Sequence, residues 1–145
     1  IDAFNRDGEK PVVYIGQDEN ELLKLLENQL RENTEEQEST AIITKTLADA
    51  KALSQTLNDK TVTLIQSENQ RLAPGVIIVP SYLAKGLEFD AVIIWHADKT
   101  RYKEDSERRL LYTVSSRAMH RLTIIAERAT TPLLNNVSKN LYEVR

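Results

Sequence analysis

The strongest constraint in this sequence is a set of short, nearly continuous apolar runs in which polar residues do not alternate with apolar ones. The clearest are VIIVP at residues 76–80, AVIIW at residues 91–95 and LTIIA at residues 122–126. A strand with one face in water alternates in polarity, whereas a strand buried on both faces does not. Three further runs lie at residues 11–16, 40–44 and 61–66. Together they predict a mostly parallel β-sheet covered on both faces.

Segments with the periodicity of amphipathic helices follow the first two strands. The first helix is predicted to begin at Asp18, with Glu21 three residues later as a capping-box partner. The acidic segment at residues 32–39 is predicted to be a loop. A second helix is predicted to start after Thr46, as its N-cap, and to end near Leu57.

Two more helices are predicted in the second half of the chain. One follows the charged stretch at residues 98–107 and carries Ala118 and Met119 on its buried side. A short helix at residues 133–139 would close the chain. Strands that alternate with helices predict a single three-layer α/β domain over residues 1–145.

Size and composition exclude several classes of protein. The chain has 145 residues, no cysteine and two histidines, which excludes disulfides and thiol chemistry and argues against a His-rich zinc site. No apolar run reaches the roughly 18–20 residues that span a bilayer, and no signal peptide is recognisable, so we expect a cytoplasmic protein without a membrane partner. The net charge of −3 argues weakly against a dedicated nucleic-acid binder. Because the sequence opens at Ile1 and not at a methionine, we expect a fragment of a larger protein.

The sequence also lacks the standard phosphate-binding motifs. Neither GxxxxGK[ST] nor GxGxxG is present, and the chain contains only four glycines. His96 is predicted at a strand end and His120 at a junction between a helix and a strand, and neither belongs to a nucleophile motif. An independent nucleotide-binding enzyme or a Ser-His-Asp hydrolase is therefore not predicted.

The loop at residues 81–90, SYLAKGLEFD, is one expected place for chemistry. Ligands of parallel α/β sheets collect beyond the carboxyl ends of the strands, where this loop begins. Lys85 and Gly86 offer a cation beside a backbone that a ligand can approach closely. Glu88 offers an acceptor for a ribose hydroxyl. The alternative is a tight connection in which Gly86 serves only its positive φ and Glu88 faces solvent.

Arg117 lies near the end of the second informative segment, ERRLLYTVSSRA at residues 107–118. On the predicted helix it follows the buried Val114 by three residues, at the edge of the apolar face, where a charge needs a partner. A phosphate would suit the planar guanidinium. The alternative is a salt bridge to an acid within the same domain.

KGLEFD, followed after an apolar strand by ERRLLYTVSSRA, resembles motifs V and VI of UvrD/Rep-type superfamily 1 helicases in order and spacing. The resemblance covers about residues 40–126 and implies a RecA-like second motor domain, the C-terminal or 2A domain. In this family ATP lies between that domain and a first RecA-like domain, which carries the phosphate loop and the acids that bind Mg²⁺. Motifs of the first domain are absent, so the resemblance implies half of an ATP site and an isolated chain without ATPase activity.

The resemblance also implies roles for individual residues. Arg117 would be the catalytic arginine finger that reaches the γ-phosphate. Gly86 and Glu88 would contact ATP, with Glu88 at the ribose. Lys85 would lie in the same ATP-binding loop.

One departure from the UvrD and Rep pattern concerns nucleic-acid contacts. Those proteins usually carry Thr-x-His just before KGLEF and use it partly to hold single-stranded DNA, whereas this chain has Pro80 and Tyr82 there. Tyr82, with the neighbouring Ser81, is still expected to contact DNA, since stacking on a base contributes about 1–3 kcal/mol. The version VPSYLAKGLEFDAVI is most similar to HelD-type, DNA helicase IV-like proteins, which act on RNA polymerase.

The leading hypothesis is therefore one half of an ATP-dependent DNA helicase or translocase. Its implied cofactors are ATP and Mg²⁺, and its implied partners are a first motor domain, single-stranded DNA and RNA polymerase. The second hypothesis is a stand-alone α/β binding module without ATPase activity. A small hydrolase that uses Glu88 or Asp90 lacks a second suitably placed group.

Overall fold

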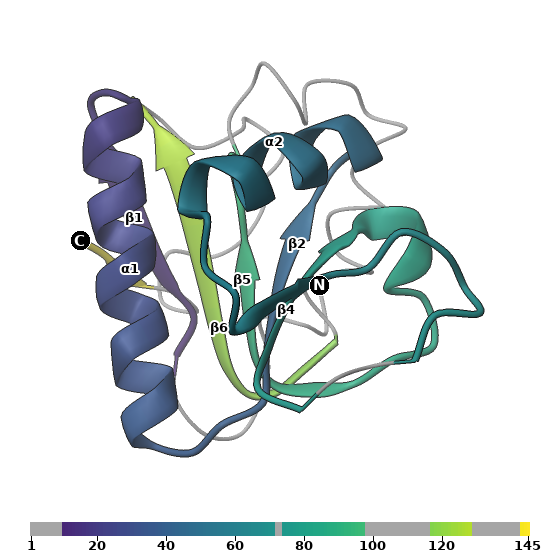
Figure 1. The fold of residues 1–145 in the computed structure, drawn as a ribbon. Coiled ribbons are helices and arrows are strands. Elements are labelled where there is room, and N and C mark those ends of the chain that lie inside the picture. The colour runs from purple at the N-terminus through teal and green to yellow at the C-terminus, as the bar shows by residue number, and fades with distance from the viewer. Residues whose placement is uncertain (1–9, 72–73, 98–116, 129–142) are drawn as a thin grey trace.

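The computed structural model describes residues 10–71, 74–97, 117–128 and 143–145. Within these ranges seven strands form one sheet, and every pair of hydrogen-bonded neighbours is parallel (Figure 1). The spatial order is β3-β4-β2-β5-β6-β1-β7. The strands are β1 (Val12–Gly16), β2 (Thr40–Thr44), β3 (Val62–Leu64), β4 (Val76–Pro80), β5 (Phe89–Ile94), β6 (Ala118–Glu127) and β7 (Glu143–Val144).

The middle of the sheet is as apolar as the sequence predicts. All five residues of β2 are buried, and β4 and β5 each have four consecutive buried residues at their carboxyl ends. Ile42 of β2 is aligned with Ile78 of β4 on one side and with Ile93 of β5 on the other. Successive side chains of these strands point to opposite faces of the sheet, and both sets are buried. Polar residues therefore do not alternate with apolar ones in the sequence.

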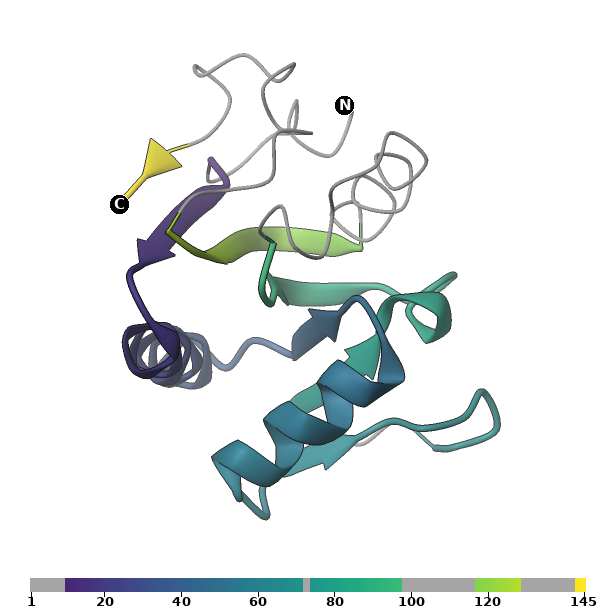
Figure 2. The ribbon, with the colours of Figure 1, turned by 90° about the horizontal axis from the view of Figure 1, so that it is seen from above.

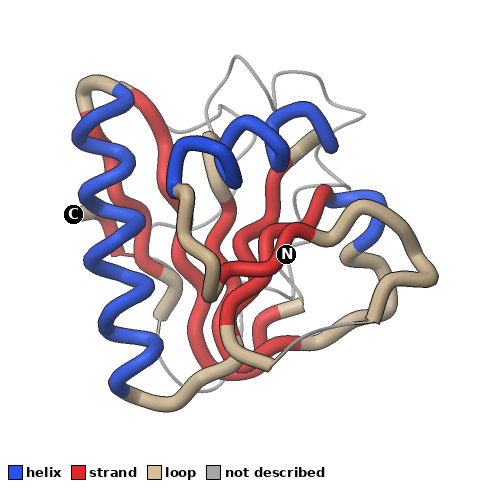
Figure 3. Tube along the Cα trace, viewed as in Figure 1, coloured by secondary structure: helices blue, strands red, loops and turns tan. Residues whose placement is uncertain are grey.

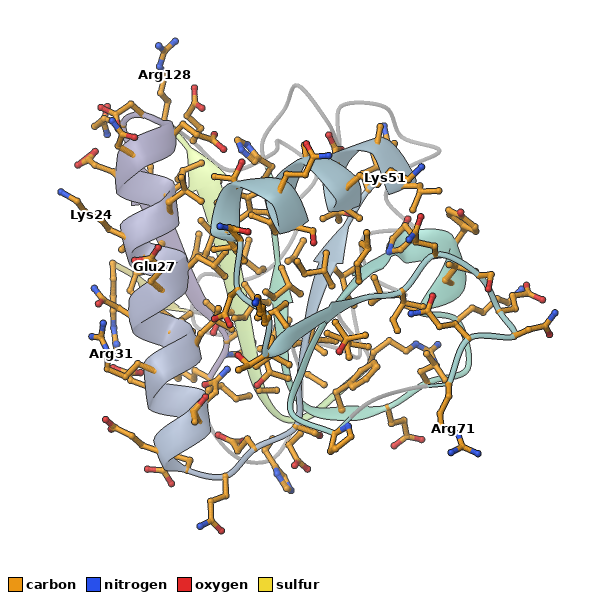
Figure 4. All side chains as sticks on the ribbon, in the orientation of Figure 1. Lys24, Glu27, Arg31, Lys51, Arg71 and Arg128 are labelled. Carbon is orange, nitrogen blue, oxygen red and sulfur yellow. The ribbon has the colours of Figure 1, made fainter. Side chains whose placement is uncertain are left out.

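The two described helices cover the same face of the sheet (Figure 2). They are α1 (Glu19–Glu35), which packs on β1 and β6, and α2 (Leu47–Leu57), which packs on β2, β3 and β4. Leu22 and Leu26 of α1 and Leu53 of α2 enter one core cluster with the sheet. The polar side of α1 carries Lys24, Glu27 and Arg31, which point away from the sheet (Figure 4). This separation of polar and apolar sides is the amphipathic pattern that predicted both helices.

The opposite face carries a second core cluster. Its members from the strands include Val13, Ile43, Ile77 and Ile94, all buried. Among the described residues, the connection between β4 and β5 covers part of this face. That connection begins with the short 3₁₀ turn η1 (Ser81–Leu83) and continues as a loop that leads back to β5 (Figure 3).

Apart from shifts of one or two residues, two element boundaries differ from the sequence-based prediction, and the short strand β7 was not predicted. α1 continues to Glu35, through part of the segment at 32–39 that was predicted as a loop. The extra turn is stabilised because Gln29 and Asn33 are buried and hydrogen-bonded to each other, with 2.9 Å between Gln29 Nε2 and Asn33 Oδ1. The sequence-based prediction looked for apolar residues at helical spacing, so it could not detect a helix end that is held by a buried polar pair.

The second difference concerns the start of β6. Ala118 and Met119 belong to this strand, so their assignment to the buried side of the predicted helix was wrong. Ala118 is aligned with Phe89 of β5, and this pairing extends the strand toward its amino end. The remainder of the predicted helix, residues 105–116, and the short helix at residues 133–139 lie outside the described residues. No helix in the described part of the chain is long and apolar enough to cross a membrane.

Candidate nucleotide-binding site

The connection from β4 to β5 contains most of the residues predicted to bind ligands. Hydrogen bonds hold its backbone in place. The Ser81 hydroxyl is buried and donates to the carbonyl oxygen of Lys45, at 2.8 Å, which fastens η1 to the loop after β2. Two successive turns follow, in which Ala84 N donates to Ser81 O at 3.2 Å and Leu87 N donates to Ala84 O at 3.1 Å. These hydrogen bonds tie the loop to the rest of the domain, and they can hold its exposed side chains in place.

Burial divides the residues of this connection into two sets. Ala84 is fully buried, and Leu83 and Leu87 pack against the core cluster beneath. The residues predicted to bind ligands, with the exception of Ser81, are the exposed ones: Tyr82, Lys85, Gly86 and Glu88. The apolar residues fix the loop on the sheet, and the polar residues between them are left available to a ligand.

Gly86 adopts a left-handed backbone conformation with φ of +81°. A side chain at this position would meet no atom within 4 Å, so space is not the reason for glycine. The reason is the positive φ, which a residue with a β-carbon adopts at an energetic cost. The same open space leaves the Gly86 backbone accessible to a ligand.

Arg117 lies next to the end of this loop. Phe89 N donates to Arg117 O at 2.9 Å, and Phe89 is aligned with Ala118 in the parallel pair β5–β6. The residues one step earlier, Glu88 and Arg117, are therefore neighbours along the same edge of the sheet. Arg117 is half-buried. The structure thus brings together two residues that the sequence analysis assigned to two different motifs.

The position of this pair differs from the expected one. We expected the chemistry beyond the carboxyl ends of the strands, but Arg117 immediately precedes β6 and so lies at the amino edge of the sheet. Because β4 and β5 are parallel, their connection must return from the carboxyl end of β4 to the amino end of β5. The loop consequently ends at the amino edge although it begins at the carboxyl edge. Arg117 itself lies in a turn in the structure.

Tyr82 and Lys85 share a pocket of about 300 Å³. Tyr82 is 55% exposed and is the only large hydrophobic side chain among the described residues with this degree of exposure. The floor of the pocket is apolar, with Ile65, Leu83 and Leu87. An aromatic ring beside a lysine is a combination that suits a nucleobase and its phosphate.

A polar network at the amino edge was not predicted from the sequence. Ser39 N donates to Asp90 Oδ2 at 2.9 Å, and Asp90 N donates to the Ser39 hydroxyl at 3.0 Å. His120 Nδ1 lies 3.6 Å from Asp90 Oδ1, and Arg121 Nε lies 3.5 Å from Glu38 Oε1. Asp90 therefore joins β5 to the residue before β2, which is a structural role and argues against its use in a hydrolase.

Comparisons with known proteins assign the sequence to a family. Residues 75–125 match the family model of the UvrD-like helicase C-terminal domain, and this range includes both the 81–88 loop and Arg117. No curated protein sequence matches the chain.

Two solved structures are similar to this one. The C-terminal domain of a possible DNA helicase from Lactobacillus plantarum WCFS1 is 49% identical, with a TM-score of 0.88 over 97% of this chain and 88% of that one. The methylated nsp10 helicase of PRRSV is 11% identical, with a TM-score of 0.54 over 98% of this chain and 31% of that one, and shares the fold alone.

The α/β fold with a parallel sheet, predicted from the apolar runs, is thus confirmed and is that of a RecA-like helicase domain. The identity and coverage of the bacterial helicase domain extend the family match beyond residues 75–125 to almost the whole chain. The chain belongs to the family of UvrD-like helicase C-terminal domains.

Proposed function

We propose that this chain is the second motor domain of an ATP-dependent superfamily 1 DNA helicase or translocase and supplies half of its ATP site. The observation that carries the proposal is the contact between the two predicted motifs, in which Phe89 N donates to Arg117 O at 2.9 Å. It places Glu88 and Arg117 side by side within the range that matches the helicase family. A first motor domain would cover them and complete the site.

The residues of the chain fit one side of a bound nucleotide. The Gly86 backbone is accessible, because no atom lies within 4 Å of the position its β-carbon would take. Glu88 is exposed and would accept a hydrogen bond from a ribose hydroxyl. Lys85 offers a positive charge on the same loop. The chain has no phosphate loop of its own, so Mg²⁺ and the β-phosphate would be held by the first motor domain.

Arg117 would be the catalytic residue of this half-site. Phosphoryl transfer depends mainly on positioning and on stabilisation of the charge that develops on the phosphate oxygens. A guanidinium supplies fixed positive charge and two parallel donors, which suits that task. The backbone hydrogen bond from Phe89 N to Arg117 O holds the Arg117 backbone in a fixed position. The guanidinium would therefore extend from a fixed point toward the first motor domain.

Single-stranded DNA would contact the pocket formed by Tyr82 and Lys85. The exposed Tyr82 ring would stack on a base, and Lys85 would lie near a backbone phosphate. Ser81 was predicted to join this contact. Its hydroxyl hydrogen is donated to Lys45 O, so Ser81 would meet nucleic acid only as an acceptor, and its main effect is to hold η1 in place.

Pro80 and Tyr82 support a HelD-like parent protein that acts on RNA polymerase. Pro80 ends β4 and is buried, and it has no N–H to offer a phosphate. Tyr82 thus remains as the exposed group at the position where the UvrD pattern has histidine. The second candidate is a stand-alone binding module. It would have the same fold but no ATPase activity, so Arg117 would have no catalytic role.

The test is the ATPase rate of the full-length parent with and without Arg117→Ala. Loss of an arginine finger lowers the rate by roughly 10³–10⁵-fold while nucleotide binding is largely retained. Arg71→Ala is the matched control, because Arg71 is exposed and points away from the body of the domain (Figure 4). Its ATPase rate should equal that of the wild type.

The same assay separates the candidate functions. Unchanged turnover in Arg117→Ala would overturn the arginine-finger role and leave Arg117 as a structural residue. Stimulation of the wild-type ATPase by single-stranded DNA would favour a helicase or translocase, and stimulation by RNA polymerase alone would favour the HelD-like parent. No ATPase activity in the full-length protein would favour the second candidate, a binding module without ATPase activity.

A further inference from the structure

Three side chains from different parts of the chain meet at the carboxyl edge of the sheet. They are Glu19 of α1, His96 after β5 and Glu127 at the end of β6, and their ligand atoms all lie within 4.8 Å of one another. His96 Nε2 lies 2.9 Å from Glu19 Oε2. We infer that Glu19, His96 and Glu127 form a binding site for one divalent transition-metal ion of the Zn²⁺ class.

The imidazole of His96 is held in a fixed position. His96 is only 6% exposed, and its ring packs edge-on against Trp95 with 4.9 Å between the ring centroids. The residues on both sides are fastened to the sheet, since Trp95 N donates to Ile43 O and Ala97 N donates to Ile125 O, each at 2.9 Å. Between these anchors His96 takes a positive φ of 57°, which is uncommon for a residue with a β-carbon.

The two carboxylates also come from rigid parts of the backbone. Glu127 is aligned with Gly16 of β1, and Arg128 N donates to Gly16 O at 2.7 Å. A β-carbon on Gly16 would lie 2.8 Å from Leu22 Cδ2, so glycine allows α1 to follow β1 closely. Glu19 is the first residue of α1, and its position above the sheet edge follows from this close packing.

The donor set suits a cation of intermediate softness. One imidazole nitrogen with two carboxylate oxygens is a combination that binds Zn²⁺ at about 2.0–2.2 Å from each ligand atom. In the tetrahedral geometry of most Zn²⁺ sites, two ligands at such bond lengths lie about 3.4 Å apart. The 2.9 Å between His96 Nε2 and Glu19 Oε2 is a hydrogen-bonding distance, so the two groups would separate by about 0.5 Å to bind an ion. Without a cation, the carboxylates of Glu19 and Glu127 repel each other at this short range. A bound ion would neutralise that charge and clamp α1 to the ends of β5 and β6.

This inference is independent of the proposed ATPase function. The cluster lies at the carboxyl edge of the sheet, whereas Arg117 lies at the amino edge. It also uses none of the residues assigned to ATP or DNA. The role that follows from its location is structural, because the ion would join a helix start to two strand ends.

The test is a calorimetric titration of the full 145-residue chain with Zn²⁺ after removal of metal with a chelator. The wild type should bind one ion per chain. His96→Gln and Glu127→Gln remove one ligand each, and each should weaken binding by more than the roughly 10–100-fold expected for loss of a supporting hydrogen-bond partner. His120→Gln is the matched control, because His120 is the other histidine of the chain and its side chain is 64% exposed. Its Zn²⁺ affinity should equal that of the wild type.

A second measurement guards against loss of the fold in the buried His96 variant. Circular dichroism reports whether each variant is folded, and Glu127→Gln, which changes a half-buried side chain, decides the question if His96→Gln is unfolded. Absence of Zn²⁺ binding by the wild type would overturn the proposal. So would equal affinities of the wild type and Glu127→Gln, or an equal loss of affinity in His120→Gln.

Discussion

At the scale of single residues, the 81–88 loop combines buried residues that pack on the core with exposed residues that are proposed to bind a ligand. Leu83 and Leu87 face the core, while Lys85 and Gly86 between them are exposed. A change at an exposed position should therefore alter ligand binding with little effect on stability. Gly86 is the exception, because its backbone conformation itself depends on the residue type.

Gly86→Ala should lower the free energy of unfolding by about 1–2 kcal/mol. The cost arises because a β-carbon disfavours the positive φ of 81° at this position, and not from a clash, since no atom lies within 4 Å. Urea denaturation of the isolated chain measures the change. Gly75→Ala is the control with the same conformation, with φ of 93° and equally open space, and it should cost a similar amount. A cost below a few tenths of a kcal/mol at Gly86 would mean that the loop relaxes to a negative φ.

At the scale of elements, α1 illustrates how local signals set the start of a helix better than its end. Asp18 is the N-cap as predicted, and its side chain accepts a hydrogen bond from Glu21 N at 2.9 Å. Glu21 accepts from Gln17 N at 2.7 Å, one residue before the position used in a standard capping box. The end of α1 depends instead on Asn33, whose side-chain oxygen accepts from both Gln29 and Arg121.

Asp18→Ala should destabilise the domain by about 1 kcal/mol, because it leaves the Glu21 backbone N–H at the helix start without its acceptor. Thr46→Ala removes the corresponding cap of α2, where Thr46 Oγ1 accepts from Asp49 N at 3.1 Å, and should cost a similar amount. Denaturant midpoints of both variants against the wild type provide the measurement. Because Asp18 lies next to Glu19, Zn²⁺ must be absent from the Asp18 experiment. A midpoint equal to that of the wild type would mean that water replaces the cap at no cost.

At the scale of the whole molecule, stability depends on the middle strands that both core clusters share. β2 and β5 are neighbours near the centre of the sheet, and successive residues of each strand enter the two clusters alternately. Ile42 and Ile93 face α1 and α2, whereas Ile43 and Ile94 face the opposite side. A defect in either strand therefore weakens the packing on which the entire domain depends.

Ile93→Ala should lower the free energy of unfolding by about 2–5 kcal/mol, and Ile93→Val by about 0.5–1.5 kcal/mol, since Ile93 is fully buried and its truncation leaves a cavity. Lys51→Ala, on the solvent side of α2, should change it by no more than about 0.5 kcal/mol. Thermal and urea unfolding of the three variants test this ranking. An alanine variant no less stable than the valine variant would show that the core around β5 collapses to fill the space.

The sequence by itself determined six of the seven described strands, the starts of the two described helices and the α/β class, because these depend on residues that are close together in the chain. The two-residue strand β7 was missed, because it is too short to form an apolar run. An apolar run such as 76–80 predicts a strand that is buried on both faces of the sheet. Asp18 and Thr46 each accept a hydrogen bond from the backbone N–H three residues later, which sets the start of a helix. Glu88 and Arg117 were assigned to the ATP site from the motifs that carry them, and these roles stay predictions. Their common position was predicted at the wrong edge of the sheet.

Only the tertiary structure decided which distant residues meet. Ser39 and Asp90 are 51 positions apart, and Glu19 and His96 are 77 apart, yet both pairs are within hydrogen-bonding distance. Such contacts follow from strand order and register, which place β5 between β2 and β6 and align Phe89 with Ala118. Strand order follows from the packing of the whole sheet and its helices, and no local segment of the chain specifies it. For the same reason the 81–88 loop and Arg117 meet at the amino edge, while Glu19, His96 and Glu127 meet at the carboxyl edge.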